Sequence, residues 1–111
     1  MKWLLTFSIC WLFQFATGQE IQVGSEWEFR QSGTEAWHPA TVPGTVHTDL
    51  FQAGIIGDPF ADMNELKQQW IEKENWEYKS IFKVGGDILK KDHIHMVFEG
   101  LDTYASVYLN D

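Results

Sequence analysis

The sequence predicts an all-β protein built as an antiparallel β-sandwich. Short segments alternate apolar and polar residues with a period of two, which is typical of strands that bury one face. The apolar positions of these segments are rich in aromatic residues, and glycines or polar runs separate the segments at the spacing found in sandwiches. The chain shows no internal repeat and no low-complexity segment. These observations favour strands packed face to face.

Residues 1–18 are predicted to be a signal peptide. Lys2 precedes a mostly apolar stretch, and Ala16-Thr17-Gly18 supplies the small residues that come before a cleavage site, here between Gly18 and Gln19. A membrane anchor is disfavoured, because spanning a bilayer takes about 20 apolar residues and polar side chains interrupt this shorter stretch. Cys10 would be lost with the signal peptide, so the mature chain 19–111 would rely on packing and not on disulfides.

Five strands are expected, at residues 27–30, 37–42, 76–84, 94–98 and 104–109. The second is confined to an edge by Pro39, and the third is the clearest, since Trp76 and Tyr78 alternate with charged residues. Between the third and fourth strands, Ile88-Leu89 is expected in a loop that tucks under the sheet. The last strand runs into a turn at Asn110-Asp111 whose return strand is missing. Residues 19–111 are therefore expected to be the incomplete front part of a longer protein.

A long connector separates the second and third strands. Roughly three dozen residues lie between Trp37 and Trp76, and connectors of this length are usually functional. Thr45 is expected to cap a short helix that places Val46, Leu50 and Ala53 on one side and stops at Gly54. A second short helix is expected to start at Asp58-Pro59.

The net charge of the chain indicates which classes of binding partner are disfavoured. The formal net charge is −8, which argues against binding to nucleic acid or to anionic membranes, whereas a neutral sugar is not repelled.

The connector also carries a family resemblance. Val42-Pro43-Gly44-Thr45-Val46-His47 and Asp58-Pro59-Phe60 resemble the amino-terminal region of the β-mannosidases of glycoside hydrolase family 2, and the run from Phe98 to Asn110 is similar to paired sandwich strands of the wider family. The resemblance implies a jelly-roll, galactose-binding-like sandwich at residues 19–111, followed in the parent protein by an immunoglobulin-like sandwich and a (β/α)8 barrel. It implies an exo-acting, retaining hydrolase of terminal β-mannose in oligosaccharides or glycoproteins.

In such enzymes the two catalytic glutamates lie on the barrel, so no catalytic residue is expected in this chain, and the mechanism requires no cofactor or metal. The chain alone is expected to be inactive, and its intramolecular partner is the downstream barrel. Export to the periplasm or the outside is expected, or to the lysosome in a eukaryote. The alternatives are another family 2 specificity, such as an exo-glucosaminidase or a β-galactosidase, and a stand-alone carbohydrate-binding sandwich.

Two connector residues are candidates for proximity to the substrate. The Asn64 amide can both donate to and accept from a sugar hydroxyl, although a capping or solvent-facing role is the alternative. Trp70 is either a platform for a sugar ring or a wedge between sandwich and barrel, and its spacing from Phe60, Met63 and Leu66 favours the wedge.

The remaining aromatic and histidine residues have structural interpretations. Trp76 is expected in the core, because it shares a strand face with Tyr78. His93 and His95 lack the third ligand that a catalytic zinc needs. His47 is expected to satisfy a buried backbone group or to pack at a domain junction.

Overall fold

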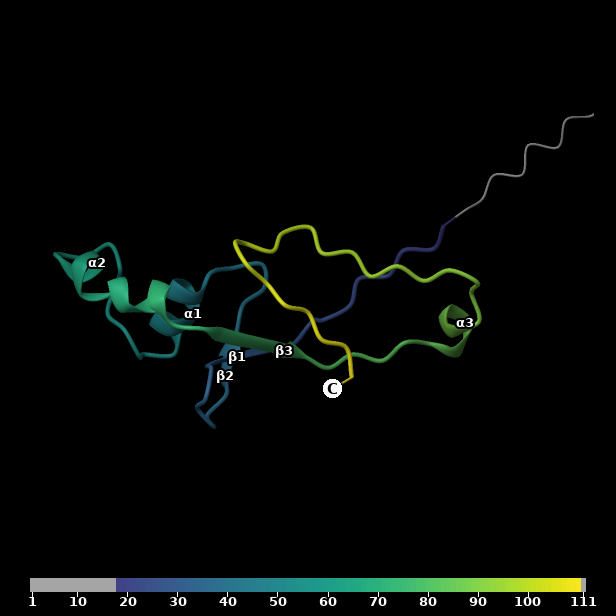
Figure 1. Ribbon diagram of the computed structural model, residues 1–111, viewed down its shortest axis with the longest axis horizontal. Helices are drawn as coiled ribbons and strands as arrows, with labels where there is room; N and C mark the ends of the chain where they lie inside the picture. Colours follow the sequence, from purple (N-terminus) through teal and green to yellow (C-terminus); the bar gives the residue numbers. More distant parts are fainter. Residues whose placement is uncertain (1–17, 111) are drawn as a thin grey trace, which may run out of the picture.

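The computed structural model describes residues 18–110, and the predicted signal peptide lies almost wholly outside them. The chain forms a three-stranded antiparallel sheet in the order β2-β1-β3. β1 spans Trp27–Gln31, β2 spans His38–Ala40 and β3 spans Trp76–Ser80. In Figure 1 the connector with α1 and α2 lies at one end of this sheet, and the loop that carries α3 lies at the other.

The first strand occupies the centre of the sheet. Phe29 pairs with His38 on one side and with Tyr78 on the other. β2 is an edge strand, as the proline at position 39 predicts, because proline cannot donate to a ladder on both sides. The alternation of side chains then sends Phe29 to one face of the sheet and Glu28 and Arg30 to the other.

The connector contains three short helical segments. α1 spans Val46–Gln52, α2 spans Asn64–Lys67, and a 3-10 helix, η1, spans Gln69–Lys73. The helix expected to start at Asp58-Pro59 begins six residues later instead. The Asp58 carboxylate accepts a hydrogen bond from the backbone N–H of Phe60 (2.9 Å), so it stabilises a turn at the position where a helix was expected.

The core lies where the connector covers the sheet. Phe29, Leu50 and Ile71 are fully buried, and Ala40, Val46, Ile56, Trp76 and Tyr78 pack around them. Leu50 comes from α1 and Ile71 from η1, so both ends of the connector reach the same strand, β1. The ring centroids of Phe29 and Trp76 are 6.2 Å apart, which confirms the core assignment of Trp76.

The carboxyl-terminal third differs from the sequence prediction. The strand expected over residues 76–84 ends at Ser80, and the strands expected at 94–98 and 104–109 do not form. Ile88-Leu89 belongs to a short helix, α3, at Gly86–Leu89, and Leu89 is exposed instead of tucked under the sheet. An alternating pattern indicates which face of a segment is apolar, but a strand also needs a hydrogen-bonded neighbour. Within residues 18–110, these late segments have none.

Candidate functional site

The connector between β2 and β3 is the candidate site, and its first helix is fixed by local sequence. Gly44 permits the chain to approach itself, because a Cβ at this position would collide with the carbonyl oxygen of Thr41. The Thr45 hydroxyl then accepts a hydrogen bond from the backbone N–H of Thr48, and the Thr48 hydroxyl lies 3.3 Å from the backbone nitrogen of Thr45. This reciprocal capping box starts α1 as the sequence predicts.

A buried carboxylate connects α1 to both edge strands. Asp49 is 1 % exposed. One of its oxygens, Oδ1, accepts a hydrogen bond from the backbone N–H of Thr41 (2.8 Å), and Oδ2 accepts one from the Tyr78 hydroxyl (2.8 Å). Burial, and secondarily the hydrogen bond to Asp49, raises the pKa of Tyr78 above its usual range, so the phenol remains a donor.

Asp49 is not among the functional residues that the sequence predicts. Its position in the helix is the feature that could identify it, because Asp49 and Leu50 follow Val46 by three and four residues and so lie on the same helical face. A charged residue inside an apolar stripe is more informative than the stripe itself.

The next part of the connector is a polar turn that fixes Asn64. The Asn64 side-chain N–H donates to the carbonyl of Asp58 (2.9 Å), and the Gln68 side-chain N–H donates to the carbonyl of Gly57 (3.0 Å). The Asn64 amide therefore stabilises the 57–64 turn in this structure. This hydrogen bond uses only the side-chain N–H of Asn64, so its side-chain carbonyl oxygen can still accept a hydrogen bond.

Trp70 lies on η1, in the carboxyl-terminal part of the connector. Its ring is 6.0 Å from that of Trp76, and it lines an apolar pocket of about 200 Å³ together with Trp76, Phe29 and His38. Asn64 does not line this pocket, so the structure does not bring the two predicted substrate-proximal residues together in it. Phe60, Met63 and Leu66 are exposed, and α2 is too short to align all of them with Trp70 on one helical face.

A second, smaller pocket has polar walls. It has a volume of about 130 Å³ and lies between α1 and the α2–η1 segment, where His47 faces Glu65 and Glu72. No group of three or more His, Cys, Asp or Glu side chains within the described part of the chain is arranged to hold a metal ion.

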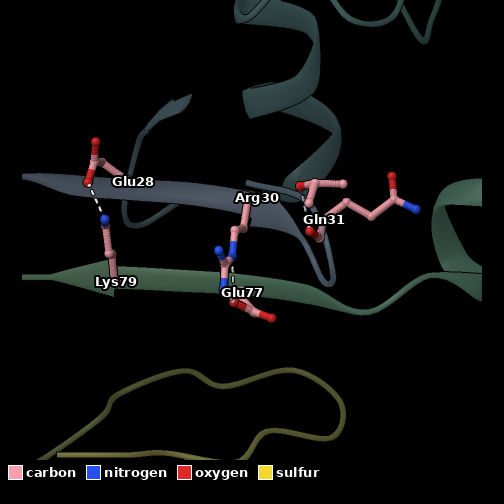
Figure 2. Close-up of polar contacts among 6 residues, drawn as sticks. Glu28, Arg30, Gln31, Glu77 and Lys79 are labelled. Atoms are coloured by element: carbon pink, nitrogen blue, oxygen red, sulfur yellow. Dashed lines mark hydrogen bonds and ion pairs between the residues drawn. The ribbon is translucent and has the colours of Figure 1, made fainter. Parts of the chain in front are cut away.

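The face of the sheet opposite the core is charged. Figure 2 shows two ion pairs between β1 and β3, Arg30 with Glu77 and Glu28 with Lys79. The nitrogen–oxygen distance is 2.6 Å in the Arg30–Glu77 pair and 3.1 Å in the Glu28–Lys79 pair. The hydrogen bond from Arg30 lowers the pKa of Glu77. Arg30 and Lys79 also lie over the Trp37 ring, 4.4 Å and 4.0 Å from its centre. Glu77 therefore has a cross-strand partner.

None of the helices formed by residues 18–110 has the length and apolarity needed to cross a membrane.

The sequence of this chain is similar to those of known proteins. Residues 27–111 match the family model described as glycosyl hydrolase 2 galactose-binding domain-like. The β-mannosidase of Bos taurus is 40 % identical over 90 residues, which cover 81 % of this chain and 10 % of that protein. The β-mannosidase of Rattus norvegicus is 32 % identical over 108 residues, covering 97 % and 12 %.

A solved structure gives the same result for the fold. The crystal structure of a β-D-mannosidase from Dictyoglomus thermophilum matches with a TM-score of 0.61 and 46 % identity, over 65 % of this chain and 9 % of that one. The chain therefore spans about a tenth of the length of the relatives it matches.

Proposed function

Because this chain belongs to the glycosyl hydrolase 2 family through its galactose-binding-like domain, we propose that it is the amino-terminal part of a β-mannosidase. The match to this domain and the structural likeness confirm the expected all-β, galactose-binding-like fold class. The observation that supports the activity is the identity of 32–40 % with mammalian β-mannosidases across most of this chain.

The reaction proposed for the whole protein is the removal of terminal, non-reducing β-D-mannose from oligosaccharides or glycoproteins, with retention of configuration. Retention uses two carboxylates about 5 Å apart, one as nucleophile and one as acid/base. Both are proposed to lie on a (β/α)8 barrel downstream of residue 111, beyond an immunoglobulin-like sandwich. Residues 19–111 would then be an accessory part of the enzyme, after removal of a signal peptide at residues 1–18 and export.

The connector is proposed to contact the barrel. Phe60, Met63 and Leu66 are 97 %, 64 % and 58 % exposed, and exposed apolar side chains suit an interface. Trp70 and Asn64 are proposed to border the sugar subsite. Trp70 is 38 % exposed and lines an apolar pocket, and Asn64 retains a carbonyl oxygen able to accept from a hydroxyl.

The test is to express the full-length polypeptide and to compare hydrolysis of aryl β-mannoside, β-galactoside and β-glucosaminide. Preference for the mannoside supports the proposal. Preference for another glycoside would assign a different family 2 specificity, and turnover by residues 19–111 alone would contradict the placement of the carboxylates.

The two site residues are tested in the same enzyme. Trp70→Ala and Asn64→Ala are expected to raise KM for the mannoside, whereas Lys67→Ala, an exposed change on α2, serves as the control. Equal KM values for all three variants would remove Trp70 and Asn64 from the subsite. Amino-terminal sequencing of the exported protein tests the signal peptide, with Gln19 expected as the first residue.

A further inference from the structure

The connector is attached to β3 by side-chain hydrogen bonds at two points within the described residues. At its carboxyl end, the indole N–H of Trp76 donates to the carbonyl of Ile71 (3.0 Å). At its amino end, the Tyr78 hydroxyl donates to Asp49. The segment between these points, which carries Asn64 and Trp70, mainly bonds to itself, as in the contact between Gln68 and Gly57.

Asp49 makes the amino-terminal attachment a junction of three elements. Thr41 directly follows β2, Tyr78 is the central residue of β3, and Asp49 lies on α1. A carboxylate has two acceptor oxygens and no obligatory donor, so it can accept from the backbone N–H of Thr41 and from the Tyr78 hydroxyl at the same time. The position and the direction of α1 relative to both edge strands are thereby fixed.

Stability alone does not account for a carboxylate at this position. Its helical neighbours on the same face, Val46 and Leu50, are apolar and pack into the core. Burying a carboxylate carries a large desolvation cost, and apolar residues of similar volume often replace buried charged groups at no loss of stability. The two hydrogen bonds of the carboxylate set the orientation of α1 relative to the sheet, because hydrogen bonds are directional and apolar contacts are not.

We propose that Asp49 is a positioning residue of the enzyme, which holds the connector at the angle that places Trp70 and Asn64 at the sugar subsite. This inference rests on the proposed function. Asp49 does not touch the substrate. It acts through α1, and its loss would displace the connector while the Trp76–Ile71 attachment persists.

The experiment uses the full-length enzyme and separates position from stability. Asp49→Ala removes both hydrogen bonds and is expected to lower kcat/KM for an aryl β-mannoside about 10- to 100-fold, mostly through KM, because small displacements of positioning groups cost this much. Asp49→Asn is expected to stay within about threefold of wild type, because its carbonyl can accept from Thr41 and its N–H can donate to the Tyr78 oxygen. Val46→Ala is the stability control, since it removes core contacts of α1 without removing a connector hydrogen bond, and Val46 does not line the pocket that Trp70 borders.

The inference is overturned if Asp49→Ala retains the wild-type kcat/KM, or if Val46→Ala at an equal loss of Tm gives the same rise in KM. If Asp49→Ala fails to fold, Tyr78→Phe removes one of the two bonds and is expected to give a smaller rise in KM. An unchanged KM in that variant counts against the proposal.

Hydrogen exchange over residues 57–70 gives a readout independent of activity. Exchange there is expected to accelerate in Asp49→Ala and not in Asp49→Asn, and equal exchange in both would refute the role of Asp49. A wild-type enzyme that cleaves no mannoside would refute the proposed function, while the exchange comparison would still decide whether Asp49 holds the connector.

Discussion

Leu50 should determine whether α1 stays docked on the sheet. It is 1 % exposed and packs in one cluster with Phe29 and Ile71, while its neighbour Phe51 on the same helix is 46 % exposed. Leu-to-Ala changes in cores cost about 2–5 kcal/mol, depending on how far the site collapses. The core here has three fully buried apolar residues surrounded by partly exposed ones, so collapse is easy and the lower part of that range applies.

We therefore expect Leu50→Ala to destabilise the docked helix by about 2–3 kcal/mol, or roughly 30- to 150-fold in the opening equilibrium. The assay is hydrogen exchange of the α1 amides and of the amide of Ala53, the residue that caps the carboxyl end of α1 and bonds to the carbonyl of Asp49 (2.9 Å). Phe51→Ala is the matched control and should change exchange by less than about threefold, as surface changes usually do. Similar acceleration in both variants would refute the assignment of Leu50 to the core.

Three further predictions concern pH and the backbone. Because the pKa of Tyr78 is raised, the contribution of this residue to stability is complete below pH 10.0, the ordinary pKa of tyrosine, and declines as the pH rises above it. Tyr78→Phe should therefore flatten the alkaline limb of a plot of Tm against pH. The lowered pKa of Glu77 acts in the opposite direction: its contribution to stability is present above pH 4.5 and is lost as the pH falls. Glu77→Gln should therefore make thermal stability less sensitive to acid, measured in low salt. An unchanged acid limb of the stability profile would contradict the Arg30 pairing. Gly54 has φ +71°, so Gly54→Ala should cost about 1–2 kcal/mol in a denaturant titration, whereas Gly86→Ala, with open space and no positive φ, should cost less.

The sequence predicts the first half of the fold well, because local rules decide it. The Thr45 cap, the end of α1 just before Gly54 and the edge position of Pro39 depend on neighbours within a few residues, and each is confirmed. The family resemblance is likewise confirmed by the domain match.

Features that depend on distant partners are predicted less well. Alternation at 94–98 and 104–109 predicts strands, yet pairing cannot be read from one segment alone. The fixed amide of Asn64 escapes prediction because its acceptor, the carbonyl of Asp58, becomes available only once the chain turns there. The role of Asp49 cannot be predicted from the sequence for a related reason, since its two donors come from residues on either side of the connector.

The central position of β1 has a consequence for synthesis on the ribosome. β1 is made before the connector, but one of its two edges is filled only when β3 emerges, and the paired residues Arg30 and Glu77 are 47 positions apart. At about 5–20 residues per second, that edge waits roughly 2–9 s for its partner. During this interval the nascent hairpin exposes Phe29 and a row of unpaired amides, which together form a target for chaperones and for neighbouring nascent chains on the same messenger.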